Sequence, residues 1–301
     1  MIFDQTNACR SEPLVSVVMS FHNSRDSLPF AINSLLWQTY SHWELILLDD
    51  GSNDGSAEFL KAIHDPRIRL YSDSVCRGLP VRLNMGVNLA QGEFIARMDA
   101  DDVAFPERLE RQVAYLQEHP DVDLLATSAL LVNGNNIPVG VLSTKLSHEE
   151  ICRRPWLGFP MPHPTWMGRT EWFRRNPYDE SARKGQDQVL LYETYQNSKF
   201  AGLPDTLLGY KYAGLSMQKT LIGRYCYLKA MRGAKNRRNW LLGNVSHAIA
   251  AARDLLSLAL GVESHVIKNR VQIADAAILA EWKELQRRLK DMKDISRMAG
   301  S

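Results

Sequence analysis

The sequence is poor in cysteine and has no long apolar run. Its four cysteines, Cys9, Cys76, Cys152 and Cys226, are scattered over 301 residues and form no C-x-x-C pair, so neither a zinc site nor a disulfide framework is indicated. No stretch approaches the roughly 18 consecutive apolar residues of a membrane span, and the N-terminus has no secretion signal. We therefore expect a cytoplasmic protein without an integral membrane anchor.

Acidic residues are missing from one long segment of the chain. The formal net charge is only +2, yet residues 206–253 contain nine lysines and arginines and no aspartate or glutamate. Such a pattern is typical of a solvated helical face, and equally of a surface that meets anionic lipid or an anionic substrate. Both interpretations stay open at this point.

Apolar periodicity predicts alternating strands and helices in the first half of the chain. Residues 14–21 form a continuous apolar run typical of a strand covered on both faces. Residues 24–38 carry apolar side chains at helical spacing, with Asp26 or Ser27 as the expected N-cap. The further expected strands are 43–48, 68–71 and 93–98, and the further expected helices lie near 55–64 and 81–90. This alternation predicts a mostly parallel sheet with helices on both faces, whose ligands bind beyond the carboxyl ends of the strands.

Clusters of aspartate follow two of these strands. Asp49 and Asp50 end one strand in LLDDGSNDGS, and Asp99, Asp101 and Asp102 follow another in RMDADD. If both strands neighbour the first strand, the clusters converge on one crevice, where carboxylates raise one another's pKa unless a cation or hydrogen-bond donors accompany them. Oxygen ligands of this kind suit Mg²⁺ or Mn²⁺, which bind through one or two carboxylates plus substrate phosphates.

A capping turn is the structural alternative for the DADD cluster. Residues 105–117 favour a helix directly after it, and aspartate is a good cap. Capping requires a single carboxylate, however, and the cluster has several. A calcium loop is disfavoured, because the sixth position of a D-x-D-x-D-G pattern that starts at Asp99 is Ala104 and not glycine. We therefore favour a functional role for the cluster.

Four motifs occur in order along the chain: VSVVMSFHN, SLLWQTYSHWELILLDDGSNDGS, GEFIARMDADDVAFPERLERQV and HPTWMGR. Together they resemble the inverting family-2 glycosyltransferases, over roughly residues 13–212. The resemblance implies an α/β fold of GT-A type, with a Rossmann-like central sheet, plus a helical C-terminal extension. It implies metal-dependent transfer of one sugar from a nucleoside-diphosphate sugar, with UDP as the expected carrier, to a glycan or lipid-linked acceptor. Polysaccharide or glycolipid assembly at the cell surface is the expected setting.

The resemblance assigns a set of residues to the base of the nucleotide. Ser20, at the end of the first strand, His22 and Asp50 occupy the matching positions. An arginine before the third helix joins them in the family, and Arg77 and Arg82 are both candidates here. The Q-x-x-R-W signature of processive synthases is missing, which favours the addition of a single sugar.

The D-x-D element is assigned to the ribose and the diphosphate. By the resemblance, Asp99 lies near the ribose, Asp101 ligates Mn²⁺ or Mg²⁺, and Asp102 caps the following helix. Many relatives carry a further metal-binding histidine near the end of the catalytic domain, but GYKYAGLSMQK has none. Metal ligation is therefore expected to rest on Asp101, diphosphate and water, with Lys211 or Lys219 assisting at the phosphates.

Inversion by direct displacement requires a base near the acceptor hydroxyl. The family places this base in an acidic pair, and Asp187 matches it, although Gln186 replaces the preceding acid. The structural alternative is that Asp187 only caps a helix over 188–195. His163, in PMPHPTW, matches a His-Pro element beside the acceptor pocket, but a lone histidine is more often a structural hydrogen-bonding group.

The C-terminal segment lies beyond the resemblance. Ile278, Trp282, Leu285, Leu289 and Met292 form an apolar seam on a basic helix. This seam predicts a partner, which can be the catalytic domain itself, a second subunit or an anionic membrane surface. A membrane surface would bind through residues 219–301 and would place the enzyme peripherally on the inner face of the membrane.

The predicted domains are an N-terminal tail (1–12), a catalytic domain (13–218) and a basic helical extension (219–301). Within the catalytic domain, 13–105 is the expected nucleotide-binding half and 106–218 the acceptor half. No nucleic-acid partner is expected.

Three other function classes are weighed against this prediction. A phosphatase of the haloacid-dehalogenase type places its D-x-D on its first strand, whereas three strand units precede Asp99 here. A nicotinamide enzyme is disfavoured because no G-x-G-x-x-G turn follows the first strand. A non-catalytic protein that binds nucleotide sugars or acts as a scaffold stays open.

Overall fold

A computed structural model of the protein describes residues 12–61, 63–212, 214, 216–233, 236–259 and 271–291. Residues 1–11 of the predicted tail and Met292 of the apolar seam lie outside the described residues. The predicted domain boundaries stay predictions.

The first half of the chain alternates strands and helices, as the periodicity predicts. Its strands are β1 (Val15–Phe21), β2 (Trp43–Asp50), β3 (Ile68–Asp73) and β4 (Phe94–Arg97). Its helices are α1 (Leu28–Leu36), α2 (Ser56–Lys61) and α3 (Leu79–Leu89). β1 lies between β2 and β4, pairs in parallel with both, and β3 extends the sheet beyond β2. The strands that carry the two aspartate clusters are therefore both neighbours of β1, as their convergence requires.

The rest of the sheet is mixed. Its strands are β5 (Val103–Ala104), β6 (Leu124–Val132), β7 (Pro138–Leu142), β8 (Met167–Arg169) and β9 (Phe200–Lys211). β8 is antiparallel to both β4 and β6, while β9 is parallel to β6. The strand order is β3-β2-β1-β4-β8-β6-β9-β5, with β7 paired to β6. The helical elements of this half are α4 (Arg108–Glu118), α5 (His148–Ile151), η1 (Pro155–Leu157), η2 (His163–Thr165), α6 (Thr170–Arg175) and α7 (Gln186–Thr194).

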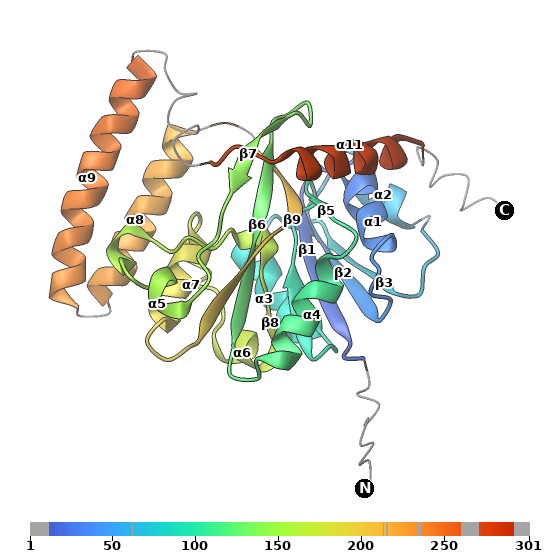
Figure 1. The fold of residues 1–301 in the computed structure, drawn as a ribbon, viewed down its shortest axis with the longest axis horizontal. Helices are drawn as coiled ribbons and strands as arrows, with labels where there is room; N and C mark the ends of the chain where they lie inside the picture. The colour runs from blue at the N-terminus through green and yellow to red at the C-terminus, as the bar shows by residue number, and fades with distance from the viewer. Residues whose placement is uncertain are drawn as a thin grey trace, which may run out of the picture.

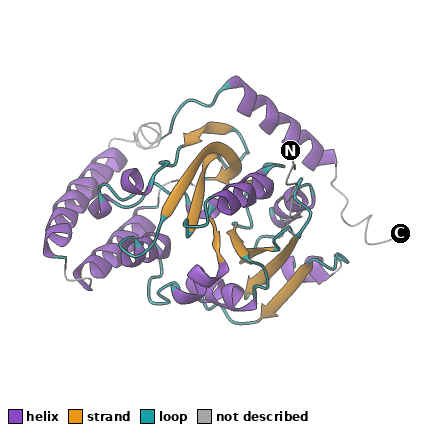
Figure 2. Ribbon diagram, turned by 60° about the horizontal axis from the view of Figure 1, so that its bottom comes forward, coloured by secondary structure: helices purple, strands orange, loops and turns teal. Residues whose placement is uncertain are grey.

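Helices cover both faces of the sheet (Figure 2). Every residue of β2 and β6 is buried, and the middle of each strand is rich in apolar residues, as expected for strands covered on both faces. Alternate residues of β1 divide between two cores: Val17 and Met19 pack with α1 and α4, and Val18 packs with α3, α6 and α7. This sandwiching leaves the carboxyl ends of β1, β2 and β4 as the open edge of the parallel region.

Of the two predicted caps of the first helix, the structure places Ser27 in the cap position but shows no side-chain capping bond. Asp26 lies one residue too early to cap α1. The backbone N–H groups of Ser27 and Leu28 instead donate to the carbonyl oxygen of Ser24, at 3.1 and 2.9 Å. A preceding turn therefore takes the place of a side-chain cap.

In the described part of the chain beyond the sheet, the helices are α8 (Met217–Gly233), α9 (Arg237–Ala259) and α11 (Ala276–Asp291). α8 and α9 form a hairpin at one side of the molecule, whereas α11 runs across the other side, over α1 and β5 (Figure 1). Trp282, Leu285 and Leu289 of α11 are buried against a cluster that includes Val103 and Leu130. Of the three partners predicted for the apolar seam, the structure shows the catalytic domain itself.

Candidate active site

A cleft of about 410 Å³ opens at the carboxyl ends of β1 and β4. We call it the acidic cleft. It is lined by residues 20–27, Asp54, residues 99–101 and Lys211. The structure therefore brings together five predicted site residues: Ser20, His22, Asp99, Asp101 and Lys211. Lys219, the alternative to Lys211, lines a different pocket beside α8.

Asp50 and Arg82 form a buried pair beside this cleft. Arg82 is 1% exposed, and its Nε donates to Asp50 Oδ1 at 3.0 Å. The backbone N–H groups of Arg77 and Gly78 also donate to Asp50, at 2.7 and 3.1 Å. Burial alone would raise the pKa of Asp50, but the hydrogen bonds from Arg77 and Arg82 outweigh it and lower that pKa. Asp50 is therefore a fixed, ionised carboxylate.

The two candidate arginines have different positions. Arg82 also donates to both oxygens of Asp73 and so links β2, β3 and α3. The side chain of Arg77 is half exposed and pairs with Asp73 at 3.2 Å, so only its backbone contacts Asp50. His22 joins this group from the cleft, because its ring Nδ1 donates to the carbonyl oxygen of Asp50 at 2.9 Å.

Asp99 and Asp101 face the acidic cleft from the loop after β4. Asp99 accepts a hydrogen bond from Arg97, the buried last residue of β4. Desolvation by the surrounding protein raises the pKa of Asp101, the negative charge of Asp99 raises it further, and Lys211 offsets part of this rise. The two carboxylates are thus close enough to repel each other, which is the condition that a bound cation relieves.

The predicted role of Asp102 as a helix cap is wrong. α4 begins at Arg108, and the residue in its cap position is Glu107. Asp102 is fully buried, and its Oδ1 accepts the backbone N–H of Lys211 at 2.9 Å. Burial, together with the charges of Asp99 and Asp101, raises the pKa of Asp102 well above its ordinary value. Asp102 therefore anchors the end of β9, which holds Lys211 at the cleft.

A second pocket, of about 270 Å³, contains Asp187 and His163. We call it the Asp187 pocket; it is also lined by Leu142, Ser143, residues 159–164, Gln188 and Tyr210. The capping alternative for Asp187 is wrong, because α7 already begins at Gln186 after Gly185, whose φ of 72° is left-handed. Asp187 lies within the first turn, and its side chain points to the pocket.

The surroundings of Asp187 adjust its acidity. Its Oδ2 accepts from Gln188 Nε2 at 3.3 Å, while Gln188 Oε1 accepts the backbone N–H of Phe159 at 2.7 Å. Burial raises the pKa of Asp187, and the hydrogen bonds with Gln188 and the charge of Arg97 only partly oppose this rise. A carboxylate with a raised pKa is a better proton acceptor near neutral pH.

His163 is a buried, neutral side chain of the same pocket. Its Nε2 lies 2.9 Å from Tyr178 Oη, and its ring meets Trp166 edge-on at 4.6 Å. Burial, and then the charge of Arg97, lowers the pKa of His163 well below its ordinary value. His163 therefore has a hydrogen-bonding partner within the protein, Tyr178, and its contact with an acceptor stays a prediction.

Arg97 connects the two pockets and was not predicted from the sequence. It is 3% exposed, contacts Asp99 on one side, and its charge affects the acidity of Asp187 and His163 on the other. A second buried arginine, Arg108, donates to the carbonyl oxygens of Arg97 and Pro164 at 2.6 and 2.9 Å. The sequence signal that could have identified Arg97 is a charged residue within the otherwise apolar strand FIAR.

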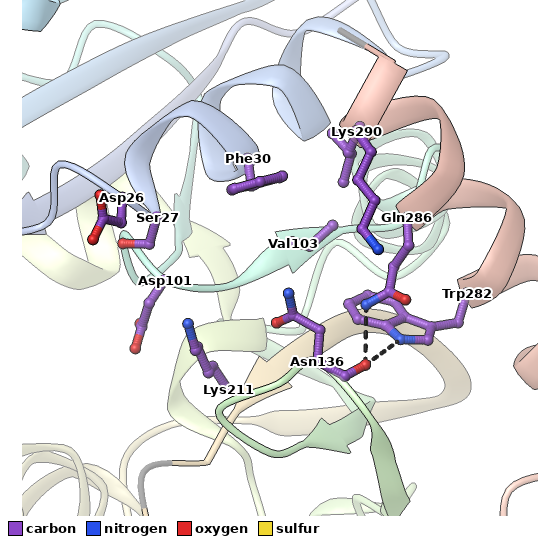
Figure 3. A pocket seen from close by; sticks show the side chains of 11 residues that line it. Asp26, Ser27, Phe30, Asp101, Val103, Asn136, Lys211, Trp282, Gln286 and Lys290 are labelled. Atoms are coloured by element: carbon purple, nitrogen blue, oxygen red, sulfur yellow. Dashed lines mark hydrogen bonds between the residues drawn. The ribbon is translucent and has the colours of Figure 1, made fainter. Parts of the chain in front are cut away.

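Helix α11 lines a second hollow that adjoins the acidic cleft and shares Asp101 and Lys211 with it. Figure 3 shows Asp101 and Lys211 at the rim of a hollow of about 100 Å³, whose far wall is formed by α11. Trp282 and Gln286 of α11 both donate to the carbonyl oxygen of Asn136, at 3.1 and 3.0 Å. The C-terminal helix thus borders the hollow next to the acidic cleft.

Among the described residues, no group of three or more histidine, cysteine, aspartate or glutamate side chains is arranged to hold a metal. Asp99 and Asp101 face the acidic cleft from the loop after β4, and Asp26 and Asp54 also line it. A pair of carboxylates fits Mg²⁺ or Mn²⁺ when substrate phosphates supply the remaining ligands.

Comparisons with known proteins agree with this architecture. Residues 16–176 match the family model described as glycosyl transferase family 2. The putative glycosyltransferase EpsE of Bacillus subtilis is 35% identical over 197 residues, which cover 64% of this chain and 70% of that protein. The Escherichia coli protein WfgD, named as a UDP-Glc:alpha-D-GlcNAc-diphosphoundecaprenol beta-1,3-glucosyltransferase, is 29% identical over 147 residues, 48% of this chain and 57% of that protein.

Solved structures share the fold. The crystal structure of S. aureus TarS 1-349 in complex with UDP-GlcNAc matches with a TM-score of 0.57 at 20% identity. The match covers 72% of this chain and 66% of that chain. At this level of identity the likeness concerns the fold alone.

Proposed function

The chain belongs to glycosyl transferase family 2 and has the GT-A fold that its motifs predict, and from this premise we propose which reaction it catalyses. It transfers one sugar from a UDP-sugar to a hydroxyl group of a glycan or lipid-linked acceptor, with inversion at the anomeric carbon. Surface polysaccharide or glycolipid assembly is the proposed setting, at the cytoplasmic face. The arrangement of an acidic cleft and an Asp187 pocket around one buried arginine carries the proposal.

The donor nucleotide is proposed to bind at the carboxyl ends of β1 and β2. Asp50 is held by Arg82 and by the backbone of Arg77 and Gly78, mostly through its Oδ1. Its Oδ2 accepts the backbone N–H of Gly78 at 3.0 Å and the thiol of Cys76 at 3.3 Å. Because Oδ2 has fewer donors than Oδ1, it is the oxygen proposed to accept an N–H of the base. The TarS complex with UDP-GlcNAc supports a UDP-sugar as the donor class.

The diphosphate is proposed to lie over Asp101. Asp101 would hold a divalent cation, with Asp99 beside it, and Lys211 at the same rim would contact the phosphates. When bound, Mn²⁺ or Mg²⁺ supplies positive charge to the leaving diphosphate. Asp102 holds the backbone of Lys211 and so fixes the distance of this lysine from the cleft.

Asp187 is proposed as the catalytic base. It takes the proton of the acceptor hydroxyl while the hydroxyl oxygen bonds to the anomeric carbon, and the bond from that carbon to the diphosphate breaks with its electron pair leaving on the diphosphate. Its raised pKa suits this role. Arg97 is a positioning residue, because its bond to Asp99 and its charge near Asp187 fix the two sides of the site relative to each other.

The proposed acceptor class rests on the name of a relative and not on a contact in the structure. WfgD is named for an acceptor on diphosphoundecaprenol, and we extend a lipid-linked acceptor to this chain as part of the proposal. A non-catalytic protein that only binds nucleotide sugars is the alternative, and turnover of the donor separates the two.

The test is a panel of nucleotide sugars, assayed for binding and for slow donor hydrolysis with Mn²⁺ and with Mg²⁺. We expect one UDP-sugar to bind and turn over only with a divalent cation, and Asp101→Ala to lose the metal-dependent part of binding. Asp121→Ala, which changes an exposed aspartate that does not line the acidic cleft, is the matched control. Metal-independent binding by the wild type, or unchanged binding by Asp101→Ala, would contradict the proposed donor site.

A further inference from the structure

The α8–α9 hairpin is fixed to the catalytic domain through its inner side. Tyr227 of α8 donates to the carbonyl oxygen of Pro155, and Asn239 of α9 donates to Tyr195 Oη at 3.3 Å. Arg224 of α8 forms a buried ion pair with Asp254 of α9. Specific polar contacts thus hold the inner side of the hairpin. We call the opposite side, which makes none of these contacts, the outer side.

The outer side of α9 carries an exposed apolar stripe. Leu241, Val245, Ile249, Leu255 and Leu256, which we call the α9 outer face, are 49%, 61%, 66%, 54% and 60% exposed. Leu241, Val245 and Ile249 recur every four residues and Leu256 follows seven residues later, so these side chains lie along one side of the helix. Isolated exposed leucines are ordinary, but a continuous stripe of this kind marks an interaction surface.

The charges of the hairpin are almost all positive. Asp254 is the one acidic residue of α8 and α9, and it is buried in its pair with Arg224. Exposed cations are present on both helices: Lys219, Lys229, Arg232, Arg237 and Arg238. Arg237 and Arg238 precede Leu241 by one helical turn, on the side of the α9 outer face. The surface therefore combines apolar side chains with uncompensated positive charge.

We propose that the α9 outer face docks on an anionic lipid bilayer, with α9 lying in the plane of the interface. Apolar side chains would enter the boundary between headgroups and acyl chains, and Arg237 and Arg238 would contact anionic headgroups. None of the described helices is long and apolar enough to cross a bilayer. A second copy of the chain fits this surface less well, because its outer face offers no exposed acidic residue to pair with Arg237 and Arg238.

The position of the hairpin relates this surface to the acceptor side of the site. A pocket of about 380 Å³ lies beside the contact between α7 and the hairpin and is lined by Lys184, Gln188, Lys219 and Tyr227, among others. Gln188 also lines the Asp187 pocket. Docking on α9 would therefore turn the acceptor side, and not the nucleotide side, towards the lipid. This orientation rests on the proposed function, whereas the docking itself does not.

The test is co-sedimentation of the full chain with vesicles of phosphatidylcholine alone and of phosphatidylcholine mixed with phosphatidylglycerol. We expect wild type to bind the anionic vesicles selectively. The double variant Val245→Glu with Ile249→Glu should bind them about tenfold more weakly or worse, because both glutamates replace apolar side chains that the interface would bury. Arg237→Glu with Arg238→Glu should lose the preference for anionic lipid.

The matched control is Ile137→Glu, which changes an exposed isoleucine (56%) at the β6–β7 turn and should bind vesicles like wild type. Circular dichroism and donor hydrolysis, measured in parallel, should be equal for all variants, so a failure of docking is distinguishable from a failure of sugar transfer. Equal binding by wild type and the Val245→Glu, Ile249→Glu variant would overturn the proposal. So would a wild-type dimer that ignores vesicles and that this variant converts to a monomer.

Discussion

Helices α9 and α11 lie in the same basic C-terminal region and each carries an apolar stripe, but they use it in opposite ways. On α11, Trp282, Leu285 and Leu289 are 2–3% exposed against the core of the catalytic domain. On α9, the residues of the outer face are about half exposed or more. An apolar stripe thus predicts that a helix has a partner. Which partner it has depends on whether the catalytic domain provides a surface of matching shape.

The difference has an identifiable cause on the α11 side. The ring of Trp282 packs directly on Gly209 of β9, where an added Cβ would lie 2.2 Å from it. Phe105 adds a tilted ring contact at 6.0 Å, and Asn136 accepts the indole N–H. A receptor of matching shape therefore exists for α11, and the described part of the chain places no such receptor against the α9 outer face.

The largest difference between the two helices should appear in stability. Trp282→Ala should lower the free energy of unfolding by about 3–5 kcal/mol, because it removes a buried aromatic side chain and leaves a cavity. Val245→Ala on α9 should change it by no more than about 0.5 kcal/mol, since that side chain is already in water. Urea unfolding of both variants measures the contrast, and equal losses would mean that α11 does not pack as described.

A smaller effect should follow from adding a methyl group to Gly209, on which the ring of Trp282 packs. Gly209→Ala should lower the free energy of unfolding by about 1–3 kcal/mol, because the new methyl group would push the indole off β9. The matched control is Gly233→Ala at the end of α8, where an added Cβ has no neighbour within 4 Å. Thermal melts compare the two. A neutral Gly209→Ala would show that the indole is not seated there.

The smallest effect should be a pH dependence below pH 5 that arises from an exposed carboxylate of α11. Hydrogen bonds from Arg287 and Arg288 lower the pKa of Glu284 to about 2. A lowered folded-state pKa contributes stability above the unfolded value of about 4.3, and this contribution is lost as the pH falls from there towards 2. Because Glu284 is exposed, the change should be slight.

Between pH 5 and pH 2, the free energy of unfolding should therefore change a little less with pH for Glu284→Gln than for wild type. Arg238→Gln, which removes a charge from α9, should follow the wild-type profile. Superimposed profiles for wild type and Glu284→Gln would show that the α11 ion pairs are not formed in solution.

Much of the fold was predictable because its signals are local. The runs 14–21 and 43–48 are apolar since β1 and β2 are covered on both faces, and the topology then brings Asp50, Asp99 and Asp101 to one edge of the sheet. The motifs shared with the family already mark these carboxylates in the sequence. Their convergence needed only the parallel pairing of β1 with its two neighbours.

What could not be predicted depends on contacts between distant segments. The residues next to Asp102 predict that it caps a helix, but it is buried by β9 and bonded to Lys211, which is 109 residues away. Arg97 looks like a strand residue, yet it lies between the two pockets because Asp99, Asp187 and His163 surround it from three parts of the chain. Choosing between α9 and α11 as the packed helix likewise required the shape of β9 around Gly209.

The most direct test of the account compares Asp187→Asn with Glu193→Gln, an exposed carboxylate on the same helix. Binding of UDP in the presence of Mn²⁺ and the rate of sugar transfer are measured for both. We predict that Asp187→Asn binds UDP like wild type but transfers sugar roughly 10²–10⁴-fold more slowly, as expected when a general base is removed, while Glu193→Gln is unchanged in both. A wild-type transfer rate in Asp187→Asn would contradict the proposed mechanism.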